Sequence, residues 1–223
     1  MQSQQAEVTW KDGVPVSTAF DDPYYSLQNG LAETEHVFLA GNDLPTRFCD
    51  GLHIAELGFG TGLNLLATLK AWIGAGVPGC LRYTSFERFP MTADDIAEAL
   101  LPFEELNEAA DALCAALQTG ATTFVLQDKI NLTLMIGDAR DIVPAWNGAA
   151  DIWYLDGFSP AKNPELWEPA LLQAVFNHTA SGGTAATYSA AGAVKSGLRT
   201  AGFEVTRCPG FGRKRHMTRA RKP

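Results

Sequence analysis

The chain has 223 residues, of which 46% are hydrophobic and 19% charged, with a formal net charge of −8. A chain of this length buries one sizeable core without disulfides or a structural metal. It has no apolar run long enough to cross a membrane, and its N-terminus lacks the features of a secretory signal. Four scattered cysteines without a CxxC pair indicate a reducing compartment, so we expect a cytoplasmic protein without a metal site.

Strands and helices are predicted to alternate along most of the chain. Residues 1–50 are predicted to be irregular apart from a helix over 30–42. Strands are predicted at 52–57, 81–87, 150–156, 182–189 and 203–208, and helices at 63–76, 163–179 and 191–202. Residues 92–118 are predicted to form helices broken at Pro102. Residues 122–138 are predicted to form a hairpin, or two short neighbouring strands, on either side of 127–129.

This alternation predicts an α/β fold, in which a mainly parallel sheet is covered by helices on both faces. We expect a single domain with two parts. An N-terminal extension, residues 1–50, packs on a core, residues 51–223, and the core carries a small insertion around residues 90–130.

A glycine-rich loop follows the first predicted core strand. The stretch IAELGFGTGLN has an acid at Glu56, alternate glycines at Gly58, Gly60 and Gly62, and then the start of a helix. Glycines at this position allow a sharp turn and close approach of a ligand at the carboxyl ends of the strands. A tight turn without any ligand would also explain a GxGxG pattern.

Three further acids stand at the ends of predicted strands. Glu87 is placed to accept hydrogen bonds from a ribose diol, Asp138 lies where an adenine would bind, and Asp156 ends the strand WYLD. This order of strand ends resembles that of the class I S-adenosylmethionine-dependent methyltransferases, which have a Rossmann-like fold. NAD is the main alternative cofactor, but no His or Lys is placed for hydride chemistry.

Four longer motifs make the resemblance more specific. They are GFGTGLN (58–64), SFERFP (85–90), LDGFSPAKNPELW (155–167) and GFGRKRHM (210–217). Together they resemble the methyltransferase domain of the bifunctional tRNA 5-methylaminomethyl-2-thiouridine biosynthesis proteins. The resemblance implies methyl transfer from S-adenosylmethionine to the amine of 5-aminomethyl-(2-thio)uridine at the tRNA wobble position. Because the flavin-dependent domain of that family is absent here, we expect no flavin, and a separate flavin-dependent or other enzyme that supplies the substrate.

The resemblance and the motifs together suggest roles for particular residues. The expected cofactor-binding residues are Glu56, Gly58, Gly60, Gly62, Asn64, Glu87, Asp138 and Asp156. The expected substrate-binding residues are Tyr25, Phe158, Ser159, Pro160, Lys162, Arg213 and Arg215. Asp156 is also the expected catalytic residue, which orients the amine. Several of these residues also have a purely structural interpretation. Asp156 could cap the end of its strand, Phe158 could pack in the core, and Lys162 could be a solvated side chain.

The expected partner is the anticodon loop of tRNA. Residues 195–223 carry nine basic side chains and one acid, a charge of +8, which leaves −16 on residues 1–194. The basic end either binds phosphate or is a solvated surface, and charge alone leaves both open. If Arg213, Lys214 and Arg215 lie in a strand, Lys214 points away from the two arginines.

Two other functions are compatible with the sequence. One is a methyltransferase that acts on another nucleoside or a small amine. The other is a methyltransferase-like domain without catalysis that binds a partner protein through its acidic surface.

Overall fold

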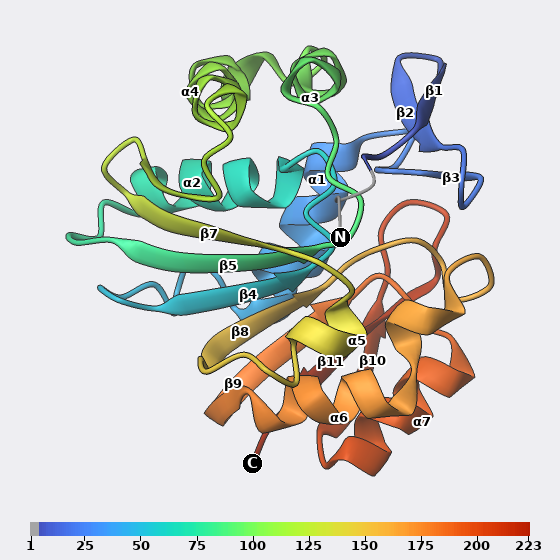
Figure 1. Cartoon of the computed structure of the whole chain (residues 1–223). Coiled ribbons are helices and arrows are strands. Elements are labelled where there is room, and N and C mark those ends of the chain that lie inside the picture. Colours follow the sequence, from blue (N-terminus) through green and yellow to red (C-terminus); the bar gives the residue numbers. More distant parts are fainter. Residues whose placement is uncertain (1–4) are drawn as a thin grey trace.

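A twisted eight-stranded sheet forms the centre of the computed structural model, which describes residues 5–223 (Figure 1). The first four residues of the predicted N-terminal extension lie outside this range. The strand order is β10-β11-β9-β8-β4-β5-β7-β6. The strands are β4 (His53–Leu57), β5 (Leu81–Glu87), β6 (Thr123–Leu126), β7 (Ile130–Ile136), β8 (Ala150–Leu155), β9 (Thr179–Thr187), β10 (Glu204–Pro209) and β11 (His216–Arg221).

The middle of the sheet is parallel and its two edges are antiparallel. Strands β7, β5, β4, β8 and β9 pair in parallel. At the edges, β11 runs antiparallel to both β9 and β10, and β6 runs antiparallel to β7. All five residues of β4 are buried, as expected for a central strand that is covered on both faces. The predicted α/β fold is therefore confirmed.

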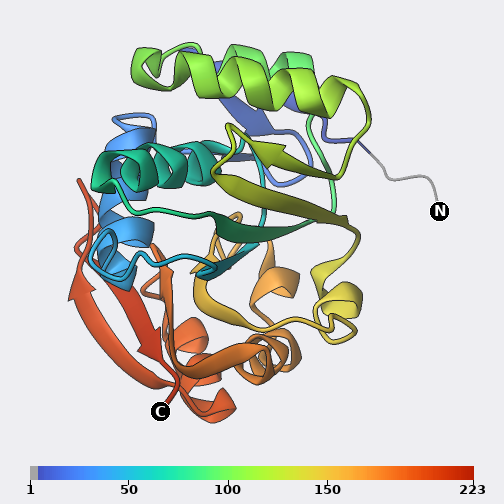
Figure 2. The same ribbon diagram turned by 90° about the vertical axis from the view of Figure 1, so that its left-hand side faces the viewer.

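Helices cover both faces of the sheet (Figure 1). One face carries α2 (Leu63–Ala75), and α3 (Ala93–Leu100) and α4 (Asn107–Gln118) form a further layer outside it (Figure 2). The other face carries α5 (Ala139–Ile142), α6 (Pro169–Asn177) and α7 (Gly192–Ala201). No helix within residues 5–223 has the length and apolar character needed to span a membrane.

One predicted helix is divided in the structure. The sequence predicts a helix over 163–179, whereas a 3₁₀ turn, Pro164–Trp167, precedes α6, which begins only at Pro169. Proline disfavours helical geometry in the residue before it, and Glu168 is accordingly extended, with ψ of 144°. The second proline therefore separates the two segments.

The insertion between β5 and β7 follows the sequence prediction. Helix α3 ends at Leu100, just before Pro102, and a 3₁₀ turn, Glu104–Leu106, leads into α4. The predicted hairpin is formed by β6 and β7, and its turn holds Gln127 and Asp128 at positive φ. This hairpin adds an antiparallel strand to the edge of the sheet.

The N-terminal region is more regular than predicted. Strands β1 (Val8–Lys11), β2 (Val14–Ser17) and β3 (Asp22–Pro23) form a separate antiparallel sheet, which corrects the prediction of an irregular segment. These strands have at most four residues, too few to show a clear alternation of apolar side chains. The helix predicted over 30–42 is a succession of α1 (Gly30–Thr34), a π-helical turn (Glu35–Leu39) and a 3₁₀ turn (Ala40–Asn42).

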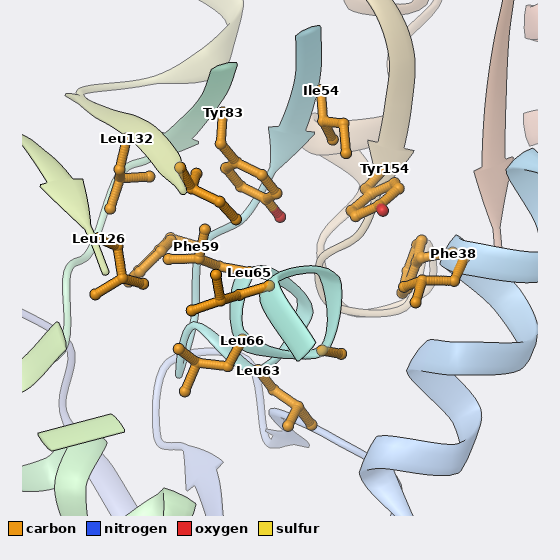
Figure 3. Close-up of a cluster of buried hydrophobic side chains, with 14 of the residues drawn as sticks. Phe38, Ile54, Phe59, Leu63, Leu65, Leu66, Tyr83, Leu126, Leu132 and Tyr154 are labelled. Carbon is orange, nitrogen blue, oxygen red and sulfur yellow. The ribbon is translucent and has the colours of Figure 1, made fainter. Parts of the chain in front are cut away.

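Helix α2 is the centre of the larger hydrophobic core. Leu65 and Leu66 are fully buried. Leu65 lies beside Phe59 on the side of the helix near Tyr83 of the sheet, whereas Leu66 points away from the sheet (Figure 3). The glycine loop enters this helix directly, because Gly62 is its N-terminal cap residue. Core packing on α2 therefore also positions the loop.

We predict that Leu65→Ala lowers the free energy of unfolding by about 2–5 kcal/mol, because it removes buried methyl groups and leaves a cavity. Ile73→Ala, on the same helix but at a side chain that is 51% exposed, should change it by less than about 0.5 kcal/mol. Urea unfolding of both variants measures the difference. Equal losses would contradict this description of the core.

Candidate active site

A cavity of about 520 Å³ lies beyond the carboxyl ends of β4, β5 and β8. Its volume is in the range of small-molecule sites. Its walls come from the loops after these strands, the N-terminal segment 17–27, helix α1 and the turn between β10 and β11. The predicted site residues that line it are Tyr25, Gly58, Gly60, Asn64, Glu87, Asp156, Phe158 and Ser159.

The glycine loop forms one wall of the cavity. Gly58, Gly60 and Gly62 all have positive φ, at 81°, 53° and 76°, so side chains there would strain the backbone. A Cβ atom on Gly60 would also lie 3.2 Å from the ring of Tyr24. The glycines thus expose bare backbone at Gly58 and Gly60 to the cavity, whereas Gly62 lies behind it and starts α2.

Glu87 holds the loop in place from the end of β5. Its Oε2 accepts a hydrogen bond from Gly60 N at 3.1 Å, and its Oε1 accepts one from Phe89 N at 2.7 Å. Burial raises the pKa of Glu87, and these backbone donors oppose the rise. Each oxygen keeps a further lone pair, so Glu87 can also accept hydrogen bonds from a bound hydroxyl group.

Asp156 is fixed by two donors at the end of β8. Its Oδ1 accepts from Gly157 N at 2.8 Å, and its Oδ2 accepts from Asn64 Nδ2 at 2.7 Å. Asn64 is itself oriented by the hydroxyl of Thr34, which donates to Asn64 Oδ1 at 2.8 Å. The carboxylate therefore has a defined orientation at the cavity wall.

Glu56 supports this carboxylate from below and does not line the cavity. It is fully buried, and its oxygens accept from Asn64 Nδ2 at 2.9 Å and from Ser85 Oγ at 2.7 Å. Burial raises the pKa of Glu56 to about 8 and that of Asp156 to about 6. Both carboxyl groups thus retain protons to higher pH than ordinary acids do.

Phe158 belongs to an aromatic group at the cavity wall. Its ring stacks on Phe20 with 4.8 Å between centroids and meets the edge of Tyr24 at 5.1 Å. Phe20 and Phe89 also line the cavity, although the sequence analysis did not select them. Tyr25 lines the cavity, and its hydroxyl donates to Ala99 O at 2.7 Å, which ties the N-terminal segment to α3.

Several predicted site residues lie outside the cavity lining. Asp138 caps α5 and forms ion pairs with Arg88 at 2.8 Å and Arg140 at 2.7 Å. The hydrogen bond from Arg140 lowers the pKa of Asp138. Lys162 is paired with Asp21, so its carbon chain and charge anchor the loop after β8 to the N-terminal segment. Pro160 lies in the same loop, partly buried.

The basic segment 213–215 is a turn and not a strand. Arg213 and Arg215 are exposed in the connection between β10 and β11. Lys214, between them, reaches the cavity and pairs with Glu33 at 2.8 Å. The sequence analysis missed Lys214 as a site residue, although the motif GFGRKRHM contained it.

Comparisons with known proteins show which family the chain resembles. The sequence profile of a family described as S-adenosyl-L-methionine-dependent methyltransferase matches residues 102–223. The chain is similar to the tRNA 5-methylaminomethyl-2-thiouridine biosynthesis bifunctional protein MnmC of Chromobacterium violaceum, with 42% identity over 98% of this chain and 34% of that protein. The corresponding protein of Ralstonia nicotianae is 45% identical over 95% of this chain and 33% of its own length.

The chain thus spans about a third of the length of these curated relatives. Among solved structures, it is similar to MNMC2 from Aquifex aeolicus, with a TM-score of 0.76 and 25% identity. That match covers 98% of this chain and 71% of the other.

We predict a pH signature for the carboxylate of Asp156. Because the pKa of Asp156 is raised to about 6 in the folded protein, proton binding stabilises the fold as the pH falls through this value. Asp156→Asn has no such titration. The difference in the free energy of unfolding, wild type minus variant, should therefore increase as the pH is lowered from about 8 to about 5. A difference that stays constant or decreases in denaturant titrations would contradict the assignment.

Proposed function

This chain belongs to the family of S-adenosyl-L-methionine-dependent methyltransferases, and from that premise we propose that it methylates the amine of 5-aminomethyl-(2-thio)uridine at the tRNA wobble position. The product would be 5-methylaminomethyl-(2-thio)uridine. The observation that carries the proposal is Asp156, a carboxylate held by two donors in the cavity next to the glycine loop. The proposal that the substrate is a tRNA rests on the names of the curated relatives.

The residues at the cavity fit the cofactor that the family implies. When bound, S-adenosyl-L-methionine supplies an electrophilic methyl group on a sulfonium ion. The bare backbone of Gly58 and Gly60 and the free lone pairs of Glu87 would hold it, with Asn64 and Asp156 at the adjoining wall. The predicted contact of Asp138 with the adenine stays part of the proposal.

The acceptor amine must be neutral when it reacts. A free alkyl amine has a pKa near that of lysine, about 10, so it is mostly protonated in neutral solution. A carboxylate alone would stabilise the ammonium form. We therefore assign Asp156 the task of orienting the amine through a hydrogen bond, while the proton passes to water. Most of the rate enhancement then comes from positioning the nitrogen about 3 Å from the methyl carbon.

The other predicted substrate contacts surround the site of methyl transfer. The wobble base would lie against Phe158, with Tyr25, Ser159 and Pro160 shaping the pocket. The exposed Arg213 and Arg215, with Lys162, would contact the RNA backbone. Such a substrate also implies a cytoplasmic site of action and a preceding reaction that makes the aminomethyl group.

A product analysis tests the proposal. The chain is incubated with labelled S-adenosylmethionine and tRNA that carries 5-aminomethyluridine, and the tRNA is then digested to nucleosides. Labelled 5-methylaminomethyluridine is the expected product. Label transferred only to another nucleoside or to a small amine would favour the alternative substrates. Failure to bind the cofactor would favour a non-catalytic domain.

We predict that Asp156→Ala lowers kcat for this transfer by at least about 100-fold, because the amine loses its orienting group. Asp151→Asn is the matched control, because Asp151 lies at the other end of the same strand, where it accepts a hydrogen bond from His53 N. This control should keep most of the activity. Full activity in folded Asp156→Ala would remove this carboxylate from the mechanism.

We further predict that tRNA binding weakens steeply between about 50 and about 200 mM salt, because phosphate contacts release counterions. The double variant Arg213→Gln, Arg215→Gln should reduce the slope of log K against log salt by about 1.4–1.8, which corresponds to two lost contacts. Lys70→Gln, an exposed lysine on α2, should leave the slope unchanged. A slope in the double variant equal to that of the wild type would exclude these arginines as phosphate contacts.

A further inference from the structure

Lys214 is the only Lys or Arg among the described residues that line the cavity. Its backbone is fixed by a closed turn, in which Lys214 N donates to Phe211 O at 3.0 Å and Gly210 N donates to Arg215 O at 3.1 Å. All three basic residues of this turn are exposed, but only Lys214 also lines the cavity. Its role therefore differs from that of its two basic neighbours.

The ammonium group is held between a carboxylate and an aromatic ring. Lys214 Nζ donates to Glu33 Oε1 at 2.8 Å and lies 4.1 Å from the ring centroid of Tyr188. The Tyr188 hydroxyl in turn donates to Gly157 O at 2.7 Å, next to Asp156. An ammonium group has three protons, and within residues 5–223 Glu33 is its one hydrogen-bond acceptor. Lys214 therefore has protons left for a ligand in the cavity.

The same short helix positions Lys214 and Asp156. Glu33 of α1 holds Lys214, and the next residue, Thr34, orients Asn64, which holds Asp156. The two charges also affect each other. Burial raises the pKa of Asp156, and the positive charge of Lys214 is among the influences that oppose the rise. Lys214 and Asp156 therefore line the same cavity, so one ligand can face both.

The proposed substrate has groups that match this pair. In 5-aminomethyluracil the amine is joined through one methylene to C5, and the neighbouring C4 carries a carbonyl oxygen. When the amine faces Asp156, the 4-carbonyl oxygen lies in the same cavity, within which Lys214 can reach it. We propose that Lys214 is a specificity-determining residue, which donates a hydrogen bond to the 4-carbonyl oxygen of the target pyrimidine. This inference rests on the proposed function.

Uracil and cytosine differ in the group that Lys214 would meet at position 4. Uracil presents an acceptor at position 4, whereas cytosine presents an amino donor, which an ammonium group cannot bind. Lys214 would then select a uracil base over a cytosine base. A phosphate contact is the other use of a lysine here, but pairing with Glu33 inside the cavity favours the base over the backbone.

Two anticodon stem–loop RNAs test the inference. They are identical except for 5-aminomethyluridine or 5-aminomethylcytidine at the wobble position, and kcat/KM is measured for each with saturating S-adenosylmethionine. The wild type should prefer the uridine RNA by about 10- to 100-fold, the typical effect of a hydrogen bond to a charged group. Lys214→Met and Lys214→Gln should each bring this ratio close to one, mainly by loss of activity on the uridine RNA.

Lys70→Met is the matched control. Lys70 also pairs with a glutamate, and its side chain is 43% exposed, against 46% for Lys214, but it lies outside the cavity lining. This variant should keep the wild-type ratio, and thermal unfolding verifies that all variants are folded. If the Lys214 variants lose activity equally on both RNAs, the ratio is unchanged and the inference is wrong. If the wild type methylates neither RNA, the proposed function itself fails.

Discussion

The amide of Asn64 joins two carboxyl groups, that of Glu56 beneath the cavity and that of Asp156 at its wall. Its two protons go to Glu56 at 2.9 Å and to Asp156 at 2.7 Å. The hydroxyl groups of Ser85 and Thr34 complete the network. Buried polar groups are costly unless they are hydrogen-bonded, so each member depends on the others. The network links α1, α2, β4, β5 and the end of β8, and it fixes the one carboxylate that we assign to the reaction.

The N-terminal segment completes the cavity that this network prepares. Asp22 accepts from Ser159 N at 2.8 Å and lies 3.6 Å from Lys162, so this segment is attached to the loop after β8. Tyr25 attaches it to α3 through Ala99. These contacts hold the segment at the wall of the cavity. Closure of the cavity therefore depends on residues far from the glycine loop in sequence.

The central sheet could be predicted because burial on both faces leaves continuous apolar runs, as in the IWYL of β8. The glycine loop was evident because its three positions with positive φ favour glycine, which leaves the GxGxG pattern in the sequence. Strands β1–β3 were missed because such short strands carry no readable period. Lys214 was missed because its direction follows from a turn that brings β10 and β11 back toward α1. Contacts between segments that lie so far apart in the chain leave no local pattern in the sequence.

The central claim is that one cavity brings the acceptor amine to Asp156 beside the methyl donor. The most direct measurement is a crystal structure of the chain with S-adenosylhomocysteine and an anticodon stem–loop RNA that carries 5-aminomethyluridine. The account predicts that the amine nitrogen lies about 3 Å from a carboxylate oxygen of Asp156 and faces the sulfur atom. An amine beyond hydrogen-bonding reach of Asp156, or a thioether bound outside the cavity, would contradict it.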